Sequence, residues 1–188
     1  GLGDETVVVF TADHGEALGE SDFWFAHGEY LIESLVRVPL VIRVPGRRTS
    51  RRADIASLLD VVPTLAGLFD FPAPKGARGR DLLSDRADAE HSDVYMALPL
   101  HTTRPRFGLV ADGHQYLLTL WGVQEQEQLF RLGQPEQDLA QIDRGRLREM
   151  GQRLATMRAG MADTRESQTQ QLSPEARRRM KALGYVGP

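Results

Sequence analysis

Hydrophobic residues in the first part of the chain are concentrated in two short, nearly uninterrupted runs, Thr6–Thr11 and Pro39–Val44. The first run is β-branched and aromatic, and such a run without polar alternation is typical of a strand buried on both faces. We therefore predict a buried, parallel strand at Thr6–Thr11 and a second strand at Pro39–Val44. The segment between them, Glu16–Gly28, has no clean period and is expected to be an ordered loop.

Apolar residues at helical spacing mark the segments around and after these strands. Glu29–Leu35 predicts a short helix, and Leu58–Phe69 predicts a longer one capped by Ser57. Pro63 lies inside the second pattern, so we expect the helix itself to begin at or just after that residue. The Pro- and Gly-rich stretch Phe71–Arg80 is expected to be a connector.

The second half of the chain has short strand-like runs separated by turn residues, which predict a small antiparallel sheet. An amphipathic helix is predicted at Leu147–Met161, where apolar residues recur every three or four positions. A last helix is expected to begin at Ser173 and to close at Gly184. The predicted strands are Val94–Leu98, Phe107–Ala111, Gln115–Leu120 and Gln128–Leu132.

This change of pattern predicts an α/β chain in two parts. Residues 1–85 are expected to form part of a large mixed β-sheet flanked by helices. Residues 86–188 are expected to form a small C-terminal antiparallel sheet with a helix. The boundary is placed in the charged connector that separates the two patterns.

Composition narrows the functions to consider. The 188 residues include 23 Lys and Arg against 26 Asp and Glu, for a formal net charge of -3, which gives no electrostatic reason to expect nucleic acid. The apolar runs are too short to span a bilayer. Because the chain has no Cys, a cysteine nucleophile, a thiolate metal site and a disulfide are excluded within these residues. The chain begins with Gly-Leu-Gly-Asp just before a predicted strand, so we expect it to be a piece of a longer protein.

Candidate chemistry begins where the first predicted strand ends, at Asp13 and His14. Ligand sites of α/β sheets lie outside the carboxyl ends of strands, and a carboxylate beside a neutral imidazole suits a metal ion. The alternative is structural: Asp13 caps the following turn, and His14 is a hydrogen-bonded linker. His27 lies one loop further on, after the aromatic cluster Phe23–Phe25, and adds a third group compatible with a metal or an oxyanion.

The stretch Val8–Gly46 resembles the signature in the second half of the sulfatases, members of the alkaline phosphatase superfamily. Four features match in order: the motif Thr-x-Asp-His-Gly-Glu at the end of a strand, the motif Leu-Gly-Glu, an aromatic-rich loop that contains His-Gly, and the motif Arg-Val-Pro-Leu-Val-Ile-Arg-x-Pro-Gly. Further segments resemble later family motifs in the same order. These are Ala56–Leu65, Gln128–Leu132 and Leu172–Val186.

The resemblance implies an alkaline phosphatase-like fold and a metal-dependent hydrolase of small-molecule or glycan sulfate esters. It makes Asp13 and His14 ligands of a divalent metal, Ca²⁺ in preference to Mn²⁺ or Zn²⁺, and His27 the contact to the substrate oxyanion. Family members use a formylglycine nucleophile matured from a Cys/Ser-x-Pro-x-Arg motif, which is absent here. The chain thus resembles the C-terminal portion alone, which we expect to be inactive by itself. The resemblance to this family also implies that the full-length protein is periplasmic, secreted or membrane-anchored.

Two other functions remain open. A phosphonate monoester or phosphodiester hydrolase of the same superfamily uses nearly the same ligands as a sulfatase. A non-catalytic pseudo-enzyme would keep the fold as a binding module after losing its nucleophile. The sequence does not define the organic part of the ester or the oligomeric state.

Overall fold

The computed structural model describes residues 2–19, 24–84, 93–98 and 104–162, together with Glu175 and Arg178. Residue contacts divide the chain into two compact units, Gly1–Ala155 and Thr156–Pro188, and the candidate site lies in the first. The predicted domain boundary after residue 85 falls in a stretch outside the described residues and stays a prediction, as does the helix expected from Ser173 to Gly184. Among the described residues, no helix has the length and apolar character needed to cross a membrane.

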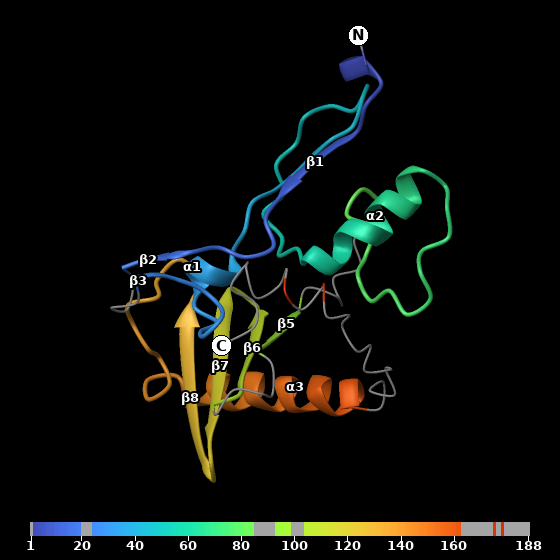
Figure 1. Ribbon diagram of the computed structural model, residues 1–188. Coiled ribbons are helices and arrows are strands. Elements are labelled where there is room, and N and C mark those ends of the chain that lie inside the picture. The colour runs from blue at the N-terminus through green and yellow to red at the C-terminus, as the bar shows by residue number, and fades with distance from the viewer. Residues whose placement is uncertain are drawn as a thin grey trace. The chain divides into compact units, whose positions relative to one another are not determined.

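The first two predicted strands form, but they pair with each other. Strand β1 (Val8–Thr11), labelled in Figure 1, runs antiparallel to β4 (Leu40–Arg43). The register pairs Thr11 with Leu40. In the described structure β4 is the single neighbour of β1, and Phe10 remains 62% exposed. The prediction of a buried, parallel strand was therefore wrong in both respects, since an apolar run does not define which strand lies beside it.

The predicted loop between these strands contains short regular elements. Strand β2 (Ala17–Leu18) pairs antiparallel with β3 (Trp24–Ala26), with an irregularity between Ala17 and Leu18. Helix α1 (Glu33–Val36) then forms within the segment predicted to be helical. It is a single turn, and its Leu35 is buried.

The predicted cap of the next helix is present in full. Ser57 and Asp60 form a capping box around the 3-10 turn η3 (Leu58–Asp60), which continues into helix α2 (Val61–Leu68). Pro63 lies in the first turn of α2, so the helix begins two residues earlier than predicted. A first turn tolerates proline because its backbone N–H groups have no intrahelical acceptor.

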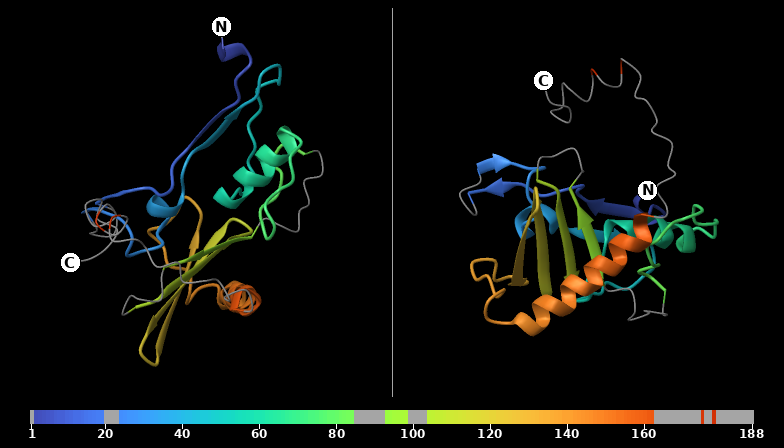
Figure 2. Two further views of the ribbon diagram at one scale, coloured as in Figure 1. Left: turned by 45° about the vertical axis from the view of Figure 1, so that its right-hand side comes forward. Right: turned by 90° about the horizontal axis from the view of Figure 1, so that it is seen from below.

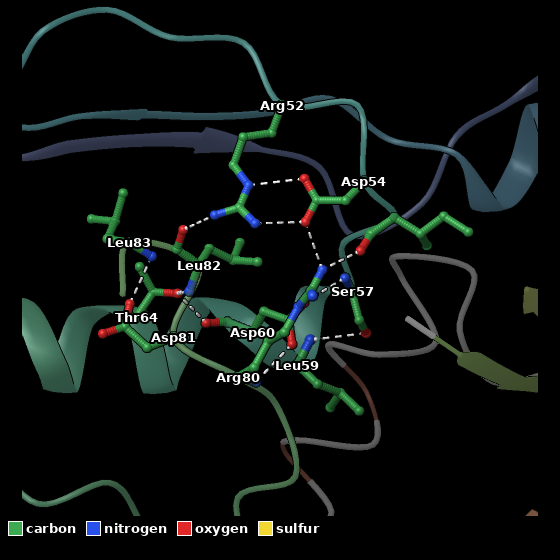
Figure 3. A network of polar contacts seen from close by, with 11 residues as sticks. Arg52, Asp54, Ser57, Leu59, Asp60, Thr64, Arg80, Asp81, Leu82 and Leu83 are labelled. Carbon is green, nitrogen blue, oxygen red and sulfur yellow. Dashed lines mark hydrogen bonds and ion pairs between the residues drawn. The ribbon is translucent and has the colours of Figure 1, made fainter. Parts of the chain in front are cut away.

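Charged and polar side chains hold the connector after α2 in place (Figure 3). Arg52 donates from Nε and Nη2 to the two carboxylate oxygens of Asp54, both at 2.8 Å, and Arg80 donates from Nη2 to the same carboxylate at 2.9 Å. The buried carboxylate of Asp60 accepts from the backbone N–H of Arg80 at 2.9 Å. Thr64, fully buried, accepts from the backbone N–H of Leu82. Polar contacts thus order a segment that has few apolar side chains.

The predicted antiparallel sheet is confirmed. Its strands follow one another in the order β5-β6-β7-β8, and Asp112–Gly113 forms the turn between β6 and β7 as predicted. The hairpin β7–β8 is longer than its sequence pattern indicated, because the outer half of β8 consists of polar residues. The strands are β5 (Val94–Ala97), β6 (Arg106–Ala111), β7 (His114–Trp121) and β8 (Gln124–Arg131).

Helix α3 (Arg144–Ala162) confirms the predicted amphipathic helix, and its first part lies along one face of this sheet (Figure 2). Met150 and Leu154 are 0% and 1% exposed, and the strands contribute Leu109, Tyr116 and Leu129 to the same core. Burying a side chain of this size contributes about 1.5–3 kcal/mol to folding. The sheet and this part of α3 therefore form the best-packed region among the described residues.

Candidate functional site

The loop that leaves β1 is held against α1 by its backbone. The N–H of Gly15 donates to the carbonyl of Leu35 at 2.8 Å. A Cβ atom on Gly15 would lie 2.0 Å from the carbonyl oxygen of Ser34, so no other residue fits there without a shift of the backbone. Glycine is therefore required by close approach to α1, and the loop carrying Asp13 and His14 has a fixed position.

The side chains of Asp13 and His14 converge. Nε2 of His14 lies 3.8 Å from Oδ2 of Asp13, while Oδ1 of Asp13 accepts from the backbone N–H of His14 at 3.0 Å. Nδ1 of His14 lies 2.8 Å from the carbonyl oxygen of Gly15, which can only accept a hydrogen bond. That contact assigns the proton to Nδ1 and leaves the lone pair of Nε2 beside the carboxylate.

His27 lies next to this pair. Its ring stacks on that of His14, with centroids 4.2 Å apart and an angle of 24° between the planes. Nδ1 of His27 lies 3.2 Å from Oε2 of Glu16, and its side chain is 44% exposed. The three residues singled out in the sequence are thus brought together, and Glu16 joins them as a partner that the sequence analysis did not single out. An acid two positions beyond His14 was the available signal.

The donor atoms of Asp13 and His14 fit a divalent cation. Two atoms 3.8 Å apart can both contact one ion bound at about 2.0–2.6 Å from each. Among the described residues, no group of three or more His, Asp or Glu side chains is placed to hold a metal. The pair therefore offers two donor positions, one hard oxygen and one imidazole nitrogen, and a complete coordination shell needs further ligands.

A second layer of contacts fixes the segment that supports the site loop. The side-chain amide of Gln115, on β7, donates from Nε2 to the carbonyl of Leu31 at 2.7 Å and is itself 3% exposed. Glu33 accepts from the backbone N–H of Gly133 at 2.8 Å. The sequence analysis missed Gln115, because a glutamine within a strand gives no local signal of burial. These contacts tie α1, and through it Gly15, to the four-stranded sheet.

Neighbouring arginine and aromatic side chains do not join the site. Arg37 donates to Glu33 at 2.6 Å, and Arg43 donates to the carbonyl of Gly3 at 2.5 Å. Trp24 packs against Gly19 and is 61% exposed, so it does not enclose a polar pocket.

Known proteins resemble the segment that contains this site. Residues 1–71 match the sulfatase family model. An ulvan-active sulfatase of Formosa agariphila is 33% identical over 85 residues, covering 44% of this chain and 17% of its own length. A choline-sulfatase of Rhizobium meliloti is 43% identical over 65 residues, covering 35% and 12%. The multifunctional alkaline phosphatase superfamily protein PehA of Trinickia caryophylli is 34% identical over 96 residues, covering 50% and 18%.

The fold resembles a solved structure as well. The crystal structure of the protein named sulfatase YidJ from Bacteroides fragilis superposes with a TM-score of 0.67 at 21% identity, over 82% of this chain and 36% of that one. This confirms the predicted alkaline phosphatase-like α/β fold, with a four-stranded antiparallel sheet and a helix among its elements. The matched segments span less than a fifth of the length of these curated relatives. Residues 1–71 are therefore similar to the sulfatase family, and the motif order and the fold support a member of that family within the alkaline phosphatase superfamily.

Proposed function

We propose that this chain supplies part of the active site of a metal-dependent sulfate-ester hydrolase. The observation that supports it most directly is the convergence of Asp13 Oδ2 and His14 Nε2 at 3.8 Å beside the ring of His27. Names of relatives and the family match agree with sulfate-ester chemistry. On this proposal the formylglycine nucleophile and the remaining ligands lie outside these 188 residues, and the chain alone is inactive.

Asp13 and His14 are the proposed ligands of the divalent ion, for which Ca²⁺ is the first candidate and Mn²⁺ or Zn²⁺ the alternatives. When bound, such an ion polarises an ester oxygen and neutralises charge that develops on it. The carboxylate of Asp13 is 76% exposed and accessible to an incoming ion. The contact from the Gly15 carbonyl holds His14 in the tautomer that keeps Nε2 free to bind a cation.

His27 is the proposed contact to the substrate oxyanion. The Glu16 carboxylate, 3.2 Å from Nδ1, can accept the Nδ1 proton and orient the ring. Nε2 can then donate to a sulfate oxygen when His27 is in its imidazolium form, in which both ring nitrogens carry a proton. A donor held in place before the reaction stabilises developing negative charge without reorganising. Glu16 acts through His27 and is therefore a positioning residue.

The test uses the complete protein and four substrates: an aryl sulfate, a phosphate monoester, a phosphodiester and a phosphonate monoester. The sulfate should be hydrolysed fastest, activity should be lost after chelation, and Ca²⁺ should restore it. Turnover that is insensitive to chelation would contradict the metal-dependent mechanism. Absence of turnover with all four substrates would favour the pseudo-enzyme.

A phosphorus-ester hydrolase is the second candidate. The match to PehA, described as a multifunctional alkaline phosphatase superfamily protein, covers half of this chain and supports this second candidate. The imidazole in the Asp13–His14 pair also suits Mn²⁺ or Zn²⁺. A phosphodiester or phosphonate rate above the sulfate rate, with Mn²⁺ or Zn²⁺ retained after purification, would establish this alternative.

A further inference from the structure

The segment 29–33, which leads into α1, is held by the four-stranded sheet at three alternate positions. Each position accepts one hydrogen bond from a different part of the sheet, namely β6, β7 and the residues just after β8. The donors and acceptors are 77, 84 and 100 residues apart in the sequence, so these are tertiary contacts. The three bonds run from Arg106 to the carbonyl of Glu29, from Gln115 to the carbonyl of Leu31, and from the N–H of Gly133 to the carboxylate of Glu33.

Helix α1 cannot hold its position by itself. It has four residues, and Ile32 at its N-cap makes no side-chain hydrogen bond to it. Isolated helices shorter than about 12–15 residues are marginal in water, so tertiary contacts decide where α1 lies. The carbonyl of Leu35 in this helix accepts from the N–H of Gly15 at 2.8 Å. The position of α1 therefore determines the position of the site loop.

Gln115 is the buried member of the three donors. It is 3% exposed, and its Nε2 lies 2.7 Å from the carbonyl oxygen of Leu31. The next residue, Tyr116, points to the opposite face, since a Cβ on Gly151 of α3 would lie 3.2 Å from its hydroxyl oxygen. Packing against α3 thus fixes β7 from one face, while Gln115 acts on the other. A buried amide without a partner is costly, which favours the bond to Leu31.

The carbonyl that Gln115 holds lies midway between the two halves of the candidate site. His27 comes four residues before Leu31, and Leu35, the acceptor of the Gly15 N–H, comes four residues after it. A displacement of Leu31 would therefore reach both halves through a few backbone bonds.

We propose that Gln115 is a positioning residue: by holding Leu31 it sets the metal affinity of the Asp13–His14 pair and the orientation of His27. It acts through the backbone of residues 27–35, and the inference rests on the proposed hydrolase function. The four-stranded sheet is then a part of the machinery of the site as well as a separate core.

Gln115→Met in the complete protein removes the donor and keeps the length of the side chain. The carbonyl of Leu31 loses its partner, so the hydrogen bond of the Gly15 N–H should open more often. Deuterium exchange at the Gly15 amide, measured in EDTA by mass spectrometry with fragmentation, should become at least about 10-fold faster. Metal binding should weaken about 10-fold and kcat should fall by a similar factor. KM should change by less than about 3-fold, because a misplaced donor is felt mainly in the transition state.

Tyr116→Phe is the matched control. It removes a hydrogen bond, from the Tyr116 hydroxyl to Oε1 of Glu127 at 2.6 Å, at the next position of the same strand and on the other face. Exchange at Gly15, metal affinity and kcat should stay at their wild-type values. Gln115→Asn keeps an amide that is too short to reach and serves as a milder variant, with circular dichroism as a check on folding.

A double-mutant cycle tests the route of the effect. Gln115→Met and Gly15→Ala both act through the contact between the site loop and α1, so their effects on metal affinity should be less than additive. Two unrelated losses of stability would add.

Wild-type exchange at Gly15 in Gln115→Met would overturn the proposal, as would unchanged metal affinity or full additivity in the cycle. Equal losses in Tyr116→Phe would also overturn it, because the sheet would then act through its general stability. Exchange at Gly15 requires neither metal nor turnover. A wild-type protein that binds no metal, or hydrolyses none of the four esters, is therefore recognised separately as a failure of the proposed function.

Discussion

The ring of His27 stacks on the ring of His14 at a centroid distance of 4.2 Å. Each imidazole has a separate anchor, the carbonyl of Gly15 for His14 and the carboxylate of Glu16 for His27. The short loop after β1 thereby orients both histidines. A change in this loop should therefore affect the proposed metal pair and the proposed substrate contact together.

Asp13→Asn in the complete protein should lower both metal content and sulfate-ester turnover, the latter on the order of 100-fold or more. An amide oxygen binds a hard cation less strongly than a carboxylate does. Metal content by plasma mass spectrometry and aryl sulfate kinetics check this. The matched control is Asp70→Asn, an exposed residue with a φ of 51°, which asparagine tolerates. Stoichiometric metal and full activity in Asp13→Asn would remove the ligand assignment.

His27→Ala should lower kcat on the order of 100-fold while leaving bound metal unchanged, because it removes a donor to the oxyanion. Glu16→Gln should lower kcat less, about 10-fold, because it loosens the ring of His27 without removing it. Metal analysis accompanies the kinetics. Loss of metal in His27→Ala would make that residue a ligand instead.

Gly15→Ala should damage the site through the backbone. The new Cβ would lie 2.0 Å from the Ser34 carbonyl oxygen, so the loop must move away from α1. We expect a loss of about 1–3 kcal/mol of unfolding free energy and at least 10-fold weaker metal binding. Urea unfolding and metal titration measure the two effects. In the control Gly160→Ala nothing lies within 4 Å of the added Cβ, and alanine in a helix should stabilise by up to about 1 kcal/mol.

Met150→Ala should destabilise the small sheet and its helix by about 2–5 kcal/mol, since Met150 is fully buried and its removal leaves a cavity. The control is Arg148→Ala, at an exposed position of the same helix, which should change the unfolding free energy by less than about 0.5 kcal/mol. Chemical denaturation followed by circular dichroism gives both values. Equal midpoints for the two variants would show that α3 does not pack on the sheet as described.

Acid should destabilise the fold through two aspartates. The hydrogen bond from Arg153 lowers the pKa of Asp112, and the hydrogen bond from Arg52 lowers the pKa of Asp54. When the pKa of an aspartate is lower in the folded state than its unfolded value of about 3.9, the ionised group stabilises the fold at pH values above about 3.9. This stability is lost as the pH falls through the folded-state pKa. Unfolding free energy should therefore decrease on acidification from pH 5 to pH 2.

Asp112→Asn isolates one of these contributions. Its positive φ of 48° suits asparagine, so the variant keeps the turn while losing the charge. The difference in unfolding free energy between wild type and Asp112→Asn should shrink as the pH falls below about 4. This difference should be small at any pH because Asp112 is 47% exposed. An undiminished difference at pH 2 would argue against the ion pair with Arg153 as the cause.

Local sequence signals predicted much of the chain correctly. Ser57 sits before an apolar stripe and forms the capping box, and Asp112–Gly113 forms a hairpin turn between two alternating runs. The spacing of Met150 and Leu154 predicted the buried face of α3. Each of these features depends on residues within a few positions, which is why the pattern was sufficient.

Strand pairing and contacts between residues far apart in the sequence could not be predicted from local sequence signals. Whether β1 is parallel or antiparallel depends on which strand lies beside it, and its neighbour β4 is about thirty residues away. The burial of Gln115 depends on its hydrogen bond to Leu31, which is more than eighty residues away in the sequence.

The amino-acid sequence by itself determined most of the elements, the resemblance to the sulfatases and the candidate side chains Asp13, His14 and His27, because motifs and periodicity are written in consecutive residues. Only the tertiary structure decided that these side chains meet, that Glu16 orients His27, and that Gly15 is needed for close approach to Ser34. The physical reason is that hydrogen bonds, ring stacking and steric contact depend on distances in space, which are fixed only when α1 and the strands around it pack together.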